Sequence, residues 1–170
     1  MKRKLFIPDK KVFECLNKMS FIEHGLVLNG QSTFHSFHTI NENEVLKLIV
    51  NAFIDMSGPK YRLLEIWANR YGRGGYVSEH NHKSPILESM NVDGKAGVYF
   101  FKKPKMSGDF VLDGKKQNVE EGDMLLFNSD KNHYSLPNES DEERIVFSIN
   151  LAKGVEKIWI NKNQFKLKRI

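Results

Sequence analysis

The hydrophobic pattern changes its period near Tyr61, and this change limits the chain to a small set of folds. Beyond it, apolar and polar residues alternate in short segments separated by glycine-containing turns, one of them at 72–75. Such alternation is typical of half-buried strands. The expected strands are 61–71, 76–82, 96–102, 109–112, 124–127, 133–136 and 144–151, with a weaker one at 157–167. Seven or eight short strands at this spacing predict an antiparallel sandwich or jelly-roll barrel.

The residues before Tyr61 predict helices that support this barrel. Residues 9–19 have apolar positions at helical spacing. A second helix follows Asn41 and Glu44, which have the spacing of a capping box, and ends at Gly58. Its expected apolar stripe consists of Val45, Leu48, Ile49, Ala52, Phe53 and Met56.

Length and composition fit one globular domain. The chain has 170 residues, of which 40% are hydrophobic and 28% charged. We therefore expect a mostly β domain over 1–170. Its parts would be N-terminal helical support in 1–60, a barrel core in 61–152 and a C-terminal strand or tail in 153–170.

Cysteine content and charge bear on location and partners. The single cysteine, Cys15, forms no internal disulfide, which favours a reducing, cytoplasmic setting. No stretch reaches the roughly 20 apolar residues of a membrane span, and the basic amino terminus lacks the apolar run of a signal peptide. We therefore expect no membrane partner. The net charge of +5 permits nucleic acid as a partner without requiring it.

Three of the six histidines could bind a metal together. His80 and His82 are two residues apart in an expected strand, so both imidazoles can point to one side, and His133 begins a later strand. Three such ligands would leave coordination positions open, and imidazole suits iron, zinc, copper and nickel. The alternative is that His80 and His82 are exposed polar residues at a strand end and that His133 is a turn residue.

The segments around these histidines follow one another in a recognisable order. They are residues 67–71, 75–82, 97–101 and 122–127, then His133 and residues 144–150. This series resembles the Fe(II)/2-oxoglutarate-dependent oxygenases, especially prolyl-hydroxylase-like members and small bacterial or phage relatives. The resemblance covers residues 61–152 and implies a double-stranded β-helix, the jelly roll shared with cupins.

The resemblance also implies a metal centre, with one departure from the family pattern. The family holds iron with a His-x-Asp/Glu pair and a distal histidine, to which His80 and His133 correspond. His82 stands where the family has a carboxylate, so the site lacks that negative charge. The consequence would be weaker iron binding, another metal, or completion of the site by an acid such as Glu79 or Glu88.

The resemblance further implies a cosubstrate site. Arg144 lies 11 residues after His133, where the family's arginine binds the far carboxylate of 2-oxoglutarate through its planar fork. A surface ion pair with a nearby acid is the alternative for Arg144. Tyr71 and Tyr99 would also contact the cosubstrate, unless Phe100 takes the position given to Tyr99.

The implied activity uses Fe(II), O2 and 2-oxoglutarate, which is decarboxylated to succinate while a substrate is hydroxylated. A small molecule, a peptide or a nucleobase could be that substrate. Two other functions remain open, a cupin-type metal enzyme and a non-catalytic jelly-roll module for binding or structure. The long connection at 83–95 is expected to form a lid over the site.

Overall fold

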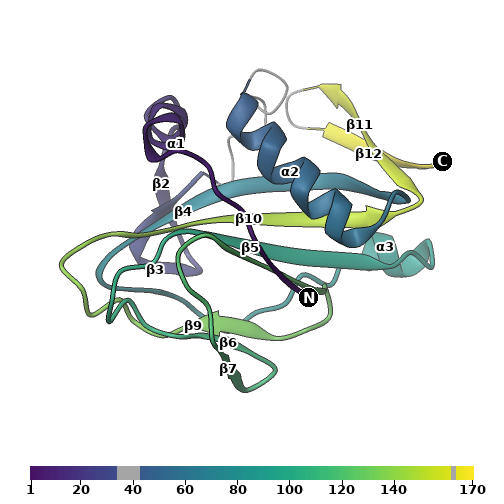
Figure 1. Cartoon of the computed structure of the whole chain (residues 1–170). Coiled ribbons are helices and arrows are strands. Elements are labelled where there is room, and N and C mark those ends of the chain that lie inside the picture. The colour runs from purple at the N-terminus through teal and green to yellow at the C-terminus, as the bar shows by residue number, and fades with distance from the viewer. Residues whose placement is uncertain (34–42, 162–163) are drawn as a thin grey trace.

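The computed structural model describes residues 1–33, 43–161 and 164–170. It shows a large antiparallel sheet with helices on one face and a small sheet on the other (Figure 1). The predicted fold class, a mostly β jelly roll with N-terminal helices, is confirmed.

Seven strands form the larger sheet. In spatial order they are β1 (Lys2–Lys4), β8 (Asp123–Asn128), β5 (Gly94–Lys102), β10 (Arg144–Lys153), β4 (Tyr61–Val77), β3 (Val27–Ser32) and β2 (Ile22–His24). The smaller sheet has the order β7 (Lys115–Gln117), β6 (Phe110–Leu112) and β9 (His133–Ser135). A separate hairpin pairs β11 (Val155–Asn161) with β12 (Gln164–Arg169), where the sequence predicted one strand.

Side chains of the larger sheet alternate between two cores, as period-2 geometry requires. On β5, Tyr99 and Phe101 pack into the core beneath the helices, whereas Val98 and Phe100 face the smaller sheet. Across the gap between the sheets, the Phe100 ring meets the Phe110 ring of β6 edge-to-face at 5.6 Å. Val98, Phe100 and the other side chains on this face of the larger sheet therefore line the space between the sheets.

The helices cover the outer face of the larger sheet (Figure 1). They are α1 (Asp9–Leu16), shorter than predicted, and α2 (Glu44–Ser57). The predicted cap Asn41 lies outside the described residues, and Asn43 caps α2 by accepting from the backbone N–H of Val45 at 2.9 Å. The predicted stripe of α2 is buried except for Leu48, which faces solvent.

One contact sets how closely α2 approaches the sheet. The Phe53 ring of α2 lies directly over the backbone of Gly97 on β5, and both Phe53 and Ile149 are fully buried there. A Cβ at position 97 would stand 2.9 Å from Phe53 Cδ1 and 3.0 Å from Ile149 Cγ2. Glycine is thus required at this position by packing rather than by a turn.

The sequence predicted a turn at 72–75 between two strands, and this prediction is wrong. The segment is a bulge inside the 17-residue strand β4, because Leu28 pairs with Tyr76 while Gly30 pairs with Tyr71. Gly74 has φ +75°, which glycine adopts without strain. The bulge keeps β4 continuous while bending it over the space between the sheets.

The amino-terminal segment contributes strands as well as helices, which the sequence did not predict. β1 pairs with β8 at one sheet edge, while β2 and β3 extend the other edge beside β4. The Lys2 and Lys4 amines of β1 pair with the buried carboxylate of Asp123, at 2.8 and 3.2 Å. None of the described helices is long and apolar enough to cross a membrane.

Candidate metal centre

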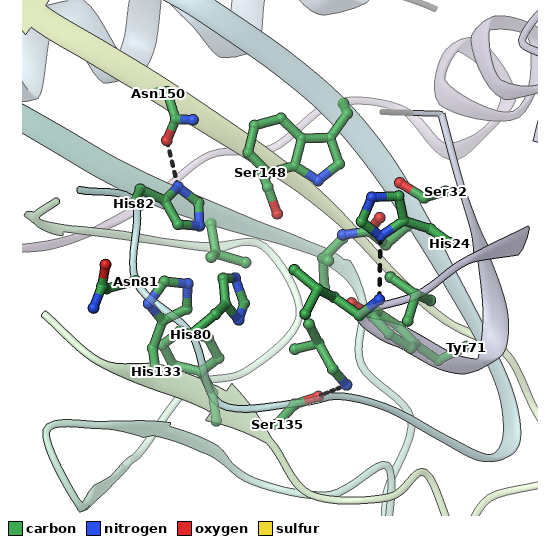
Figure 2. A pocket seen from close by; sticks show the side chains of 18 of the residues that line it. His24, Ser32, Tyr71, His80, Asn81, His82, His133, Ser135, Ser148 and Asn150 are labelled. Carbon is green, nitrogen blue, oxygen red and sulfur yellow. Dashed lines mark hydrogen bonds between the residues drawn. The ribbon is translucent and has the colours of Figure 1, made fainter. Parts of the chain in front are cut away.

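Three histidines from two segments far apart in the sequence meet between the two sheets, as Figure 2 shows. His133 begins β9, whereas β4 ends at Val77, so His80 and His82 lie beyond it and the predicted strand 76–82 is too long. Their side chains still converge, with one potential ligand atom of each within 4.8 Å of the others. Among the described residues, this is the only group of three or more potential metal ligands.

The backbone fixes the spacing of two of these residues. His80 and His133 form an isolated antiparallel bridge, in which the His80 N–H donates to the His133 carbonyl at 3.1 Å. The His133 N–H donates back to the His80 carbonyl at 2.8 Å. The two imidazoles consequently project from one hydrogen-bonded pair, 4.3 Å apart between ring centroids.

Hydrogen bonds orient all three rings in the same way. Nδ1–H of His80 donates to the Ser78 carbonyl at 2.7 Å, and that of His133 donates to the Lys131 carbonyl at 3.1 Å. His82 uses Nδ1–H to donate to the side-chain oxygen of Asn150. These bonds assign the proton to Nδ1 in each ring. The Nε2 lone pairs are then left for a metal ion.

Burial keeps the three imidazoles neutral, which is the form that binds metals. It lowers the pKa of His82 to about 4 and that of His133 to about 3, and it also lowers the pKa of His80. For His82, the hydrogen bond to Asn150 and the charge of Glu65 oppose this effect. Neutral rings with free Nε2 atoms fit a divalent transition metal.

No carboxylate completes this ligand group among the described residues. Glu79 and Glu88, considered above as replacement acids, are exposed and outside the group. Glu79 does not line the cavity, and Glu88 lies on α3 (Pro85–Ser89). The protein atoms offered here are three imidazole nitrogens.

The histidines line a cavity of about 380 Å³ between the sheets, a volume in the range of small-molecule sites. Trp67, Phe100 and Phe110 contribute aromatic surface to its wall. The phenyl ring of Phe127 packs edge-on against His133, with centroids 4.9 Å apart. The candidate centre therefore lies in a largely apolar environment, in which charges interact strongly.

Arg144 lines the same cavity and is only 2% exposed. Its guanidinium stacks on the ring of Tyr71, 4.5 Å from the centroid. The terminal nitrogens donate to the carbonyls of Ser107, Leu136 and Gly75 and to the Ser135 hydroxyl. The predicted fork is thus engaged by the protein, and the buried Nε–H is the donor that has no partner within the described part of the chain.

The two tyrosines predicted for the cosubstrate site lie on opposite faces of the larger sheet. Tyr71 lines the cavity across from the histidines (Figure 2), and burial raises its pKa to about 12, so its phenol stays protonated. The predicted position of Tyr99 in the cosubstrate site is wrong. Tyr99 packs beneath the helices and donates to the Leu5 carbonyl at 3.3 Å, while Phe100 lines the cavity.

Sequence reasoning missed several residues of the cavity wall. Glu65, Trp67 and Asn69 share the cavity-facing side of β4 with Tyr71, so counting back in twos from Tyr71 could have found them. Lys103, just after β5, also lines the cavity, and burial lowers the pKa of its amine. Lys103 and Arg144 make this part of the wall electropositive.

The segment 83–95, predicted to be a lid, contains the short helix α3. Ser84 caps this helix by accepting from the Leu87 N–H, and the Leu87 side chain is buried. Lys83, Ser84 and Pro85 line the cavity. The segment therefore borders the cavity, and the buried side chain of Leu87 anchors it. That it moves as a lid stays a prediction.

No protein-family model matches the sequence, and no curated protein does. Several solved structures match the fold. A viral collagen prolyl hydroxylase from Paramecium Bursaria Chlorella virus-1, in complex with 2-oxoglutarate, superposes with a TM-score of 0.65 at 18% identity, over 90% of this chain and 95% of that chain. A Pseudomonas putida prolyl-4-hydroxylase gives 0.60 at 15% identity, over 90% and 91%. HygX from Streptomyces hygroscopicus, with nickel and 2-oxoglutarate bound, gives 0.60 at 11% identity, over 85% and 77%. The chain shares the fold of these proteins.

Proposed function

We propose that this protein is an Fe(II)- and 2-oxoglutarate-dependent dioxygenase that hydroxylates a small molecule, a peptide or a nucleobase. One observation carries the proposal. Three oriented Nε2 atoms and a buried, incompletely paired arginine line the same cavity, across which a metal-chelating dianion could lie. The fold shared with 2-oxoglutarate-binding proteins agrees with this assignment.

Iron would be held by Nε2 of His80, His82 and His133. The bridge between His80 and His133 sets two of these ligands before any metal arrives. Because the three side chains are neutral, the metal's full charge of +2 would remain for an anionic partner to neutralise. A dianion is therefore a better electrostatic match for this centre than a neutral chelator.

The 2-oxo acid end of 2-oxoglutarate would bind at the histidines and its far carboxylate near Arg144. Arg144 offers its Nε–H, and the protonated Tyr71 beneath it offers a second donor. The half-buried amine of Lys103 adds positive charge to the same wall. When bound, iron with this cosubstrate supplies the oxidation of a substrate C–H bond by O2, coupled to release of CO2 and succinate.

The protein's other contribution would be to shield and orient. Trp67, Phe100 and Phe110 limit the water that reaches the cavity, and the hydrogen-bonded Nδ1 atoms prevent the histidine rings from turning. Ser148 of β10 also lines the cavity (Figure 2). A fixed, water-poor site favours selective use of a strong oxidant.

Anaerobic titration tests this proposal. The protein is loaded with Fe(II) and titrated with 2-oxoglutarate while the visible metal-to-ligand charge-transfer absorption is recorded. We expect a saturable band for the native protein, loss of metal binding in His133→Ala, and weaker 2-oxoglutarate binding in Tyr71→Phe and Lys103→Gln. His24→Ala is the matched control, because His24 lines the cavity outside the ligand group.

The outcomes separate the alternative functions. Metal binding without any effect of 2-oxoglutarate would refute the dioxygenase and favour a cupin-type metal enzyme. Absence of both metal and 2-oxoglutarate binding in a folded protein would favour a non-catalytic module. Equal loss of the band in His24→Ala and His133→Ala would show that the assigned ligands are wrong.

A further inference from the structure

We propose that Glu65 supplies, through Asn150, the negative charge that the three-histidine centre lacks among its direct ligands. Glu65 and Asn150 would act as positioning residues that hold His82 and make it a stronger electron donor. This inference rests on the metal site of the proposed function. It concerns the residues behind the ligands, not the ligands themselves.

A continuous chain of hydrogen bonds links these three side chains. Nδ1–H of His82 donates to Oδ1 of Asn150 (Figure 2), and Nδ2 of Asn150 donates to Oε2 of Glu65 at 3.2 Å. The amide accepts at one end and donates at the other, so it passes polarisation between the carboxylate and the imidazole. We call this series of hydrogen bonds from His82 through Asn150 to Glu65 the Glu65 relay.

The fold brings the members of this relay together with little freedom. Asn150 of β10 and Glu65 of β4 are direct partners in the antiparallel register, immediately before a register shift. Both side chains face the cavity and are partly shielded from solvent. The relay is therefore built on two paired strands of the larger sheet, which position it more precisely than a loop would.

The other two histidines lack an equivalent partner among the described residues. His80 and His133 donate to the backbone carbonyls of Ser78 and Lys131, which carry no net charge. Of the three, only His82 is linked to a carboxylate through its Nδ1, and His82 stands where the sequence resemblance implies an acidic ligand. The negative charge is thus present at Glu65, behind His82 and Asn150, and not on a direct ligand.

Such a charge behind a ligand changes metal affinity. A histidine whose distal N–H is hydrogen-bonded toward a carboxylate is held in one tautomer and becomes a better donor, and loss of such support costs about 10- to 100-fold in metal affinity. Glu65→Gln removes the charge while keeping a side chain of the same shape. We expect it to weaken metal binding by about this factor.

Co(II) binding measures this effect without turnover. The dissociation constant is obtained by competition with a chelator, following Co(II) absorption, and the thermal midpoint of the metal-free protein reports folding. We expect Glu65→Gln to bind Co(II) about 10- to 100-fold more weakly with an unchanged midpoint. Glu88→Gln, which removes an equal charge from exposed α3, should bind as the native protein does.

A double variant that moves the carboxylate to another residue distinguishes the effect of the charge from an effect of packing. In Glu65→Gln/Asn150→Asp, the carboxylate is moved one position along the relay and accepts directly from His82. We expect this double variant to recover Co(II) affinity relative to Glu65→Gln alone. Native affinity in Glu65→Gln, or no recovery in a folded double variant, would overturn the inference.

Failure of the proposed function would look different. If the native protein does not bind Co(II), or if His82→Ala binds it normally, the three-histidine site and the relay both fall. If the histidine variants lose binding while Glu65→Gln keeps it, only the relay is wrong.

Discussion

Replacing Gly97 by alanine tests how α2 is seated on the larger sheet. The new Cβ would lie closer to Phe53 Cε1 than any real contact allows, and 3.0 Å from Ile149 Cγ2. Both neighbours are fully buried and cannot move into solvent. Overpacking of this kind costs about 1–3 kcal/mol, which for a domain of this size corresponds to a fall in Tm of about 2–12 °C.

A double-mutant cycle with Phe53→Ala isolates the cause. Phe53→Ala alone should cost about 3–5 kcal/mol because it leaves a cavity. In that background the methyl group that Gly97→Ala adds fills space and should stabilise by up to about 0.8 kcal/mol. The expected coupling is therefore about 1–4 kcal/mol, measurable by urea unfolding followed by circular dichroism. An equal cost of Gly97→Ala in both backgrounds would refute the explanation.

Two further predictions concern the tyrosines. Burial raises the pKa of Tyr71 to about 12, whereas an unfolded tyrosine titrates near 10. Its stabilising contribution is therefore complete below pH 10 and is lost as the pH rises through 12, by up to about 3 kcal/mol. Tyr71→Phe should flatten the alkaline decline in the free energy of unfolding, and an unchanged decline would contradict the burial argument. Tyr99→Phe should leave 2-oxoglutarate binding unchanged and cost about 1 kcal/mol of stability from the lost hydrogen bond to Leu5. Weaker 2-oxoglutarate binding in this variant would contradict the position of Tyr99 outside the cavity.

The convergence of the histidines could be predicted from sequence even though their secondary structure could not. His80 and His82 lie beyond the end of β4, yet their side chains still meet His133. The bridge to His133 is a contact between residues 53 positions apart, and no local pattern encodes it. The sequence predicted which histidines converge, while the backbone pair that fixes two of them needed the structure.

The error over Tyr99 has a different physical origin. Residues 96–101 are buried on both faces of β5, because one face packs on helices and the other on the smaller sheet. A strand covered on both sides reads as a continuous apolar run, so its sequence does not tell which residue faces which core. The alternation of side chains along a strand shows that Tyr99 and Phe100 face opposite cores, but it does not show which of them faces the cavity.

The missed strands and the wrong turn also have physical causes. β1 and β2 are three-residue edge strands with exposed residues, so their sequences carry little hydrophobic alternation. The glycines at 72–75 have the composition of a turn, but β3 pairs with β4 on both sides of them and keeps the strand continuous, while β10 pairs with β4 up to Tyr71. Tertiary pairing therefore overrode the local signal.

The position of β10 between β5 and β4 has a consequence for synthesis of the chain. Translation proceeds from the amino terminus, so the strands on both sides of β10 leave the ribosome before residues 144–153 exist. Without β10, the strands β1, β8 and β5 share no pairing with β4, β3 and β2, so each group would have an unpaired inner edge that can pair with another chain. Arg144 and Asn150 arrive on the strand that joins these parts. A chain without β10 therefore lacks both the continuous sheet and the complete pocket.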